Sequence, residues 1–291
     1  MASFADEDEE YPEVTDEEKL AIASQFLLQS PPGQIKEVLR DLKNLCSEDV
    51  LAEDVVAGVF HRYNNATQQV IGSIVCDEAT EIDEGHYLDP ASQSTVHVDH
   101  LHHKVINENA SDDVPPPDFP EEAMEMREAV EHELNEYIGE QYVKGTTTLS
   151  VVCSKDGYEL VVLISGEKIN LKNYWSGRWR SRFVVNINDC SLSGFVKINC
   201  HTFEDGNVQL DTSKNVSDIK LSFDNSASLG VAVRKKIVSI ESKVQDSLED
   251  MYVNMSQEAF KDMRRALPIT RQKMDWSGAQ MQLAKGFSKS K

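Results

Sequence analysis

One apolar stripe near the end of the chain constrains the fold more than any other feature. Its members follow one another at spacings of 4, 3, 4, 4, 3 and 4 residues, and they are Val233, Ile237, Ile240, Val244, Leu248, Met251 and Met255. Steps of three and four residues place side chains on one face of an α-helix. At about 1.5 Å per residue, this helix is long enough to cross a whole β-sheet. The stripe therefore predicts a long helix that covers a sheet formed elsewhere in the chain.

The sheet is predicted between residues 146 and 223. Residues 155–157 and 205–206 indicate hairpin turns, because each contains a glycine that tolerates positive φ. The expected strands lie at 146–153, 158–164, 182–188, 194–203, 207–210 and 219–223. Consecutive strands joined by hairpins favour one antiparallel sheet of five or six strands, and one face of it must be covered.

The first half of the chain alternates between helical and extended patterns. Thr15 and Glu18 form a capping box that predicts the start of a helix, and Pro31 predicts its end. Two further amphipathic segments, at 34–45 and after Ser47, complete three short antiparallel helices. Short β segments are expected at 70–76 and 95–101, followed by a proline-rich linker at 114–120 and a helix from 121 to about 142.

These patterns predict an α+β protein with an N-terminal helical stalk, a small β segment, a five-stranded antiparallel sheet covered by a long helix, and a C-terminal amphipathic tail helix. The expected parts are a disordered acidic N-terminus at 1–14, a three-helix stalk at 15–65, a small β region at 66–113, a linker and helix at 114–145, the sheet at 146–223, the long helix at 224–258 and a basic tail at 259–291.

Charge separates the tail from the rest of the chain. The net charge is −21, yet residues 259–291 carry eight bases against two acids. An acidic chain binds the phosphate backbone poorly, so nucleic acid is excluded as the main partner. Past Pro268, a helix of marginal stability would present a narrow apolar face formed by Trp276, Ala279, Leu283 and Phe287. The tail is predicted to bind an acidic protein surface, and a terminal helix packed on its own core is the alternative.

The remaining composition excludes several classes of protein. No apolar run approaches the roughly 20 residues of a membrane span, and the first eighteen residues hold nine acids and no base, unlike a secretory signal. The cysteines are odd in number and form no CxxC pair, which argues against disulfides and zinc knuckles. The sequence therefore predicts a cytoplasmic protein that is not transmembrane.

Two clusters of side chains suggest other functions. The histidines at 97, 100, 102 and 103, with Asp99, form the densest candidate metal site and would suit a metal-dependent hydrolase. On a strand, however, His97 and Asp99 face away from His100 and His102. Residues 175–183 interleave arginines with aromatics, which on a strand is the alternation of a half-buried sheet rather than a platform for nucleic acid. Without a nucleotide or nucleophile motif, no catalytic residue, metal ligand or cofactor is predicted.

Four motifs, in order along the chain, resemble those of the F-actin capping protein α-subunit family. They are Leu88-Asp89-Pro90 with Asp99-His100-Leu101, the segment WSGRWRS at 175–181, the segment FEDGNVQL at 203–210 and the segment FKDMRRALPITR at 260–271. Their order and spacing agree from the first helix to Trp276. Asp262 and Met263 depart from the family pattern, which has a small residue or Glu followed by Leu, and the stretch after Trp276 also differs.

The resemblance implies a protein without enzymatic activity that forms a heterodimer with a capping protein β subunit. The two subunits would share one sheet and bind the barbed, fast-growing ends of actin filaments independently of calcium, which blocks subunit exchange in the cytoskeleton. Phosphoinositides would compete for the same bases. The motif assigns actin contact to Lys261, Arg265 and Arg271, charge adds Arg264 and Lys273, and the apolar face adds Trp276 and Leu283. The alternatives are the metal-dependent hydrolase at His97–His103 and a scaffold subunit that does not bind actin.

Overall fold

The computed structural model describes residues 14–46, 48–106, 115–154, 157–204 and 206–254. The chain divides into two compact units at Val238/Ser239, and the packing discussed below belongs to the first. The α-helices are α1 (Asp16–Leu28), α2 (Ile35–Leu45), α3 (Glu53–Ala66), α4 (Glu121–Gln141) and α5 (Ser226–Asn254), with short 3₁₀ turns at Glu48–Leu51 and Leu171–Asn173. The strands are β1 (Val70–Ile71), β2 (Ile74–Val75), β3 (Glu81–Asp83), β4 (His86–Asp89), β5 (Ser94–Asp99), β6 (Lys104–Ile106), β7 (Thr146–Cys153), β8 (Glu159–Asn170), β9 (Trp175–Asn186), β10 (Ser191–Thr202) and β11 (Val208–Lys220).

Helices α1, α2 and α3 form the predicted stalk. The capping box at the start of α1 is confirmed: the Glu18 N–H donates to the Thr15 hydroxyl, and the Thr15 N–H donates to the Glu18 carboxylate. Leu27 and Phe60 are fully buried between the helices, and the hydroxyl of the buried Tyr63 donates to the carbonyl of Ser30 at 3.3 Å. The third helix differs from its prediction, because a 3₁₀ turn precedes α3 and Ala52 separates the two.

The small β region is larger than the sequence indicated. The predicted single segment at 70–76 is wrong: β1 and β2 form a hairpin that turns at Gly72, whose φ of 65° suits glycine. A separate sheet with the order β3-β4-β5-β6 follows, and only β5 was expected. The other three strands have three or four residues each, too short to show an alternation of apolar and polar side chains.

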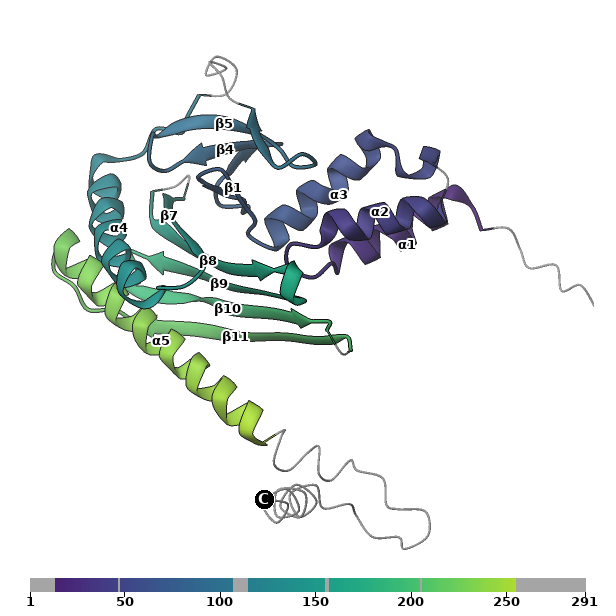
Figure 1. Cartoon of the computed structure of the whole chain (residues 1–291). Coiled ribbons are helices and arrows are strands. Elements are labelled where there is room, and N and C mark those ends of the chain that lie inside the picture. Colours follow the sequence, from purple (N-terminus) through teal and green to yellow (C-terminus); the bar gives the residue numbers. More distant parts are fainter. Residues whose placement is uncertain (1–13, 47, 107–114, 155–156, 205, 255–291) are drawn as a thin grey trace, which may run out of the picture. The chain divides into compact units, whose positions relative to one another are not determined.

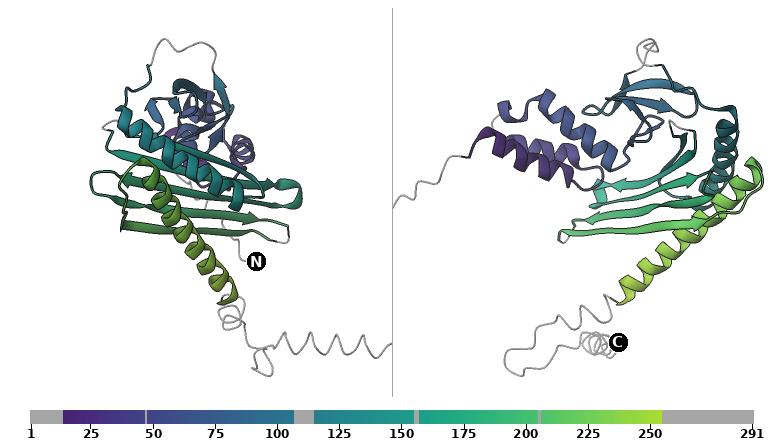
Figure 2. Two further views of the ribbon diagram at one scale, coloured as in Figure 1. Left: turned by 90° about the vertical axis from the view of Figure 1, so that its left-hand side faces the viewer. Right: turned by 180° about the vertical axis from the view of Figure 1, so that it is seen from behind.

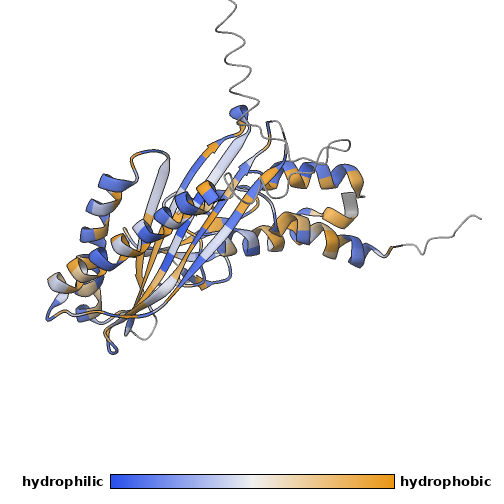
Figure 3. Ribbon diagram, turned by 90° about the horizontal axis from the view of Figure 1, so that it is seen from below, coloured by the Kyte–Doolittle hydropathy of each residue, from blue (hydrophilic) through white to orange (hydrophobic). Residues whose placement is uncertain are grey.

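The main sheet is antiparallel, with the order β11-β10-β9-β8-β7 (Figure 1). The prediction of separate strands at 207–210 and 219–223 is wrong, because the single strand β11 runs through the polar residues between them. Polar residues cover both faces of this strand, so the period of two that marks a half-buried strand is missing. The strands of the sheet carry both apolar and polar residues, as their colours in Figure 3 show.

Both faces of the main sheet are covered, not one. Residues 160–166 of β8 are buried without a break, as expected for a central strand with a layer on each side. On one face, Val161 and Leu163 pack in a cluster with Val75 and Leu88 of the small β region. On the other face lies α4 (Figure 2). Its buried Arg127 donates to the carbonyl of Val151 at 3.3 Å.

The helical cover is shared between α4 and the start of α5. Leu229, Val233 and Ile237 are fully buried, which confirms the first part of the predicted stripe. Gly230 lies against the backbone of α4, since a side chain there would come within 2.6 Å of the carbonyl oxygen of Ala129. The sequence assigned the cover to the long helix alone and placed α4 in a linker region. Within the described residues, no helix combines the length and the apolar character that crossing a bilayer requires.

Candidate functional site

The residues predicted to contact actin lie beyond Asn254, outside the described residues. They are Lys261, Arg264, Arg265, Arg271, Lys273, Trp276 and Leu283. Their roles therefore remain predictions from the sequence. The described residues form two other candidate binding surfaces, namely the edge strand β11 and a polar pocket between the stalk and the main sheet.

Strand β11 forms a long and open edge of the main sheet. It pairs with β10 along one side, and no strand among the described residues pairs with its other side. Every residue of β11 is at least partly exposed, and Val208 is 65% exposed. The register with β10 shifts between Val216 and Ile219, which marks a bulge near one end of the strand. A free edge of this length offers its unpaired N–H and C=O groups to another chain.

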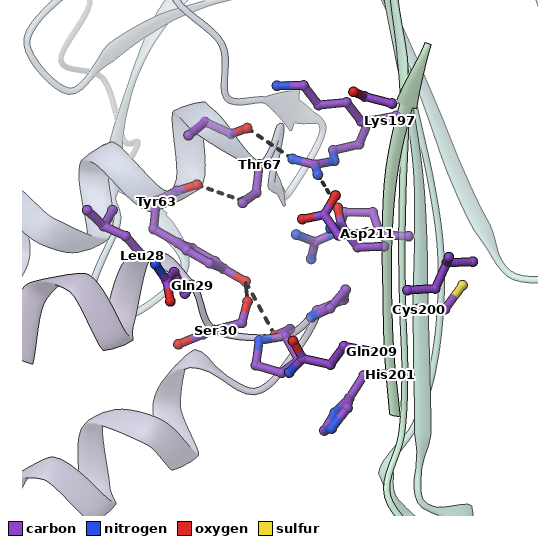
Figure 4. A pocket seen from close by; sticks show the side chains of 18 residues that line it. Leu28, Gln29, Ser30, Tyr63, Thr67, Lys197, Cys200, His201, Gln209 and Asp211 are labelled. Atoms are coloured by element: carbon purple, nitrogen blue, oxygen red, sulfur yellow. Dashed lines mark hydrogen bonds between the residues drawn. The ribbon is translucent and has the colours of Figure 1, made fainter. Parts of the chain in front are cut away.

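The pocket lies where the ends of α1 and α3 approach β9, β10 and β11 (Figure 4). It encloses about 520 Å³. The stalk side contributes the segment 28–32 together with Tyr63, Ala66 and Thr67. The sheet side is polar, with side chains from three adjacent strands, namely Arg178, Arg180, Lys197, Asn199, His201, Gln209, Asp211 and Ser213.

The strand register explains why these polar side chains gather. Arg180 lies opposite Lys197, which lies opposite Ser213 on the next strand. Two residues further along each strand, Arg178 lies opposite Asn199, which lies opposite Asp211. Directly opposed residues on antiparallel strands point to the same side of a sheet, and so do residues two apart on one strand. The two rows therefore face the pocket together.

Two buried arginines connect the sheet to the segment that follows α3. Arg178 is 3% exposed and donates to Gln69 at 2.7 Å and to Glu167 at 2.9 Å. Arg180 is 6% exposed and donates to the carbonyl of Ala66 at 3.0 Å and to the side-chain oxygen of Asn199. Burial, together with the neighbouring positive charge of Arg178, lowers the pKa of Arg180 to about 10, although the negative charge of Asp211 acts in the opposite direction.

A third connection lies at the open end of the pocket. Nδ1 of His201 lies 2.6 Å from the side-chain nitrogen of Gln34, which immediately precedes α2. Nε2 of His201 lies 3.0 Å from the side-chain oxygen of Asn207, and its ring stacks on Phe203. The stalk is thus fastened to the sheet mainly by polar contacts, whereas apolar packing dominates elsewhere in the sheet.

The predicted alternation in residues 175–183 is confirmed. Phe183 is fully buried on the side of the sheet that faces α4, while Arg178 and Arg180 point to the pocket side. What the sequence missed is the burial of both arginines. Their partners Ala66 and Gln69 are more than 100 residues away in the chain. The only signal available was the presence of arginines in a strand that is otherwise typical of a core.

The histidines at 97–103 do not converge on a common point. His100 is buried and bonded to Asn64, His102 pairs with Asp99 at 2.8 Å on the surface, and His97 stacks on His86. The described residues contain no group of three or more His, Cys, Asp or Glu side chains that could hold a metal ion. Nothing in the described part of the chain supports the metal-dependent hydrolase.

Comparison with known proteins gives a consistent result. Residues 23–285 match the family model of the F-actin capping protein alpha subunit. The F-actin-capping protein subunit alpha of Arabidopsis thaliana is 30% identical, with 94% of each chain covered. The subunit of the same name from Dictyostelium discoideum is 30% identical over 90% of this chain and 94% of its own. A solved homodimeric actin capping protein alpha subunit from Plasmodium berghei has the same fold, with a TM-score of 0.68 and 24% identity over 88% of this chain and 99% of that chain.

Proposed function

The chain belongs to the F-actin capping protein alpha subunit family, and from this membership we propose that it caps the barbed ends of actin filaments as one subunit of a heterodimer. Capping would block the addition and loss of actin subunits and would not require calcium. The protein is an actin-binding component of the cytoskeleton and not an enzyme.

The contact with actin is assigned to the basic tail. The single observation that carries this assignment is the excess of bases in residues 259–291 of a chain with a net charge of −21. A basic segment is attracted to an acidic protein surface, which speeds association and fixes orientation. Lys261, Arg265 and Arg271 are the principal contacts, with Arg264 and Lys273 beside them. Trp276 and Leu283 add an apolar contact.

Charge reversal tests this assignment. Changing Lys261, Arg265 and Arg271 together to Glu is expected to abolish the inhibition of barbed-end elongation from actin seeds, measured with the purified heterodimer. The matched control changes three exposed lysines of the described chain to Glu, namely Lys43, Lys144 and Lys172. Equal capping by the two triple variants would refute the proposed contact. The alternative of a scaffold subunit that does not bind actin predicts that truncation after Leu267 leaves filament growth unaffected.

The β subunit is proposed to pair with the open edge of β11. An added strand would satisfy the free backbone groups there and extend the sheet into the partner. The outer face of α1 supports a second contact, because Ile22 and Phe26 lie one helical turn apart and are 52% and 58% exposed. Expression alone is expected to give aggregated protein, and co-expression with a β subunit a soluble complex. A soluble, monomeric single chain would contradict this proposal.

Phosphoinositides are proposed to compete with actin for the tail bases in the cytoplasm. Each base near an anionic membrane surface contributes about 1 kcal/mol. Vesicles containing a phosphoinositide are therefore expected to reverse capping by the unaltered heterodimer, and vesicles of neutral lipid are not.

A further inference from the structure

The pocket between the stalk and the main sheet has features that structural bracing does not explain. Bracing accounts for Arg178, whose donors reach Gln69 and the carboxylate of Glu167. Bracing explains two of the three side-chain nitrogens of Arg180, which are hydrogen-bonded, but not the third. It does not explain why Lys197 lines the pocket. We propose that this pocket is a binding site for a phosphate-class oxyanion, held by the guanidinium of Arg180 and the ammonium of Lys197.

One buried donor in this pocket lacks an acceptor in the described part of the chain. The Nε atom of Arg180 is buried and has no hydrogen-bond partner within the described residues, although both other nitrogens of this side chain are bonded. A buried charged donor without an acceptor is costly and unusual in a native protein. The oxygen of a bound oxyanion would supply the missing acceptor. Guanidinium groups match the geometry of phosphate, to which they often donate through two nitrogens.

Lys197 lies on β10 directly opposite Arg180. No carboxylate among the described residues lies within ion-pair distance of its ammonium group, which sits 4.5 Å from the ring centre of Phe195. Its side chain is half-buried and lines the pocket, as Figure 4 shows. Lys197 is therefore available to a second oxygen of a ligand that Arg180 holds.

The charged side chains that line the pocket limit how much negative charge a bound ligand can carry. Arg178, Arg180 and Lys197 face two carboxylates, of which Glu167 is engaged by Arg178 and Asp211 is exposed on β11. The carbonyl groups at the ends of α1 and α3 also line the pocket, and they accept hydrogen bonds from Tyr63 and Arg180. One excess positive charge suits a single phosphate group better than a polyphosphate.

Two further facts favour a specific site. The net charge of −21 repels anions in general, so phosphate would gather at this protein only where local donors overcome that field. The volume of about 520 Å³ is that of a small-molecule site and exceeds the needs of a free phosphate ion. The shared chemistry is the phosphoryl group, and its source is either inorganic phosphate or a small phosphomonoester.

Calorimetric titration of the purified protein, in complex with its partner subunit, tests the proposal. The probes are inorganic phosphate and glycerol 3-phosphate, in a buffer without other oxyanions. Both are expected to bind, and tighter binding of glycerol 3-phosphate would identify a phosphomonoester as the source. Lys197→Gln is expected to weaken binding by about tenfold or more, since it removes one charge-assisted hydrogen bond. Within the described ranges Lys197 makes no hydrogen bond or ion pair and contacts the ring of Phe195, so this variant should fold.

Two more variants distinguish specific binding in the pocket from general electrostatic attraction of the ligand to the protein. Lys214→Gln removes the same charge from the neighbouring strand β11 at an exposed position that does not line the pocket, and binding is expected to be unchanged. Arg180→Lys keeps the charge but removes the fork of donors, and it is expected to weaken binding as Lys197→Gln does. Absence of binding by both probes at millimolar concentration would overturn the proposal. So would equal effects of Lys197→Gln and Lys214→Gln. Barbed-end capping is expected to persist in all three variants, which separates this site from the tail.

Discussion

Acidification is expected to loosen the junction between the stalk and the small sheet, because His100 is buried there in its neutral form. The amide of Asn64 donates to Nδ1 of His100 at 3.1 Å and to the carbonyl oxygen of His100 at 3.2 Å. Nδ1 must therefore accept, and Nε2 carries the proton toward the Tyr87 hydroxyl at 3.3 Å. That hydroxyl in turn donates to Asn65 at 2.6 Å. A second proton on Nδ1 would meet the amide hydrogens of Asn64. Turning that amide over would set its oxygen against the carbonyl of His100.

The size of the effect follows from the pKa of His100 in the two states. Burial lowers the pKa of His100 from 6.5 to about 4 in the folded protein, and the nearby ring of His61 contributes. Between these values the unfolded chain binds the proton and the folded chain does not. The stabilisation that depends on neutral His100 is therefore fully present above pH 6.5 and is lost progressively as the pH falls toward 4. Between pH 7.5 and pH 5, the free energy of unfolding is expected to fall by about 2 kcal/mol through this group.

Urea unfolding at pH 7.5 and at pH 5.0 measures this loss. His100→Asn keeps an acceptor near the position of Nδ1 but cannot be protonated. The variant is expected to be less stable at pH 7.5, with a loss on acidification smaller by about 2 kcal/mol than that of the unaltered protein. His86→Gln, on the neighbouring strand β4, should leave the pH dependence intact because His100 is still present. An equal loss in the His100→Asn variant and the unaltered protein would refute the reasoning.

Three further substitutions test the packing described above. Gly194→Ala is expected to prevent formation of the sheet, seen as insoluble protein or lost circular dichroism, because the new Cβ would overlap the carbonyl oxygen of Arg182. Gly58→Ala is expected to raise the free energy of unfolding by roughly 0.5–1 kcal/mol, since this glycine lies within α3 and a Cβ added there would have no described atom within 4 Å. Arg178→Met is expected to cost about 3 kcal/mol by leaving Glu167 unpaired, and adding Glu167→Gln should recover part of that loss. Failure of this second change to recover stability would show that the ion pair is not the main role of Arg178.

The sequence predicted those elements whose own residues show a pattern, either a periodic burial of apolar side chains or a local capping interaction. The stripe that begins at Val233 recurs at helical spacing because its members from Val233 to Val244 are buried, and the capping box at Thr15 needs only its own residues. Strand β11 lacked such a signal, since both of its faces are polar along most of its length. The cover provided by α4 was missed for a different reason. Its buried residues, such as Val130 and Leu134, indicate a helix with one apolar face but do not indicate what that face packs against.

The candidate sites could likewise be predicted only where their residues lie close together in the sequence. The tail could be predicted as a candidate site because its bases and its motif are contiguous in sequence, and its role stays a prediction. The pocket could not be predicted, because Arg180 meets an acceptor in Ala66 that is 114 residues away, and only the strand register brings Lys197 to its side. His100 is a similar case. The sequence placed it among candidate metal ligands, whereas its polar partners Asn64 and Tyr87 lie on other elements and give it a structural role.

The open edge and the polar pocket have a common origin in how the main sheet is covered. The small β region packs on Val161 and Leu163 of β8, so its apolar cover lies over the β7 side of the sheet, and the pocket face of β10 and β11 is left to polar residues. A strand with polar residues on both faces contributes little hydrophobic stabilisation to its own chain. Strand β11 is therefore held mainly by its ladder with β10, and no strand in the described part of the chain pairs with its other side, which is open to a second chain. The polar character that kept the middle of β11 from being predicted is thus the feature that suits this strand to a subunit interface.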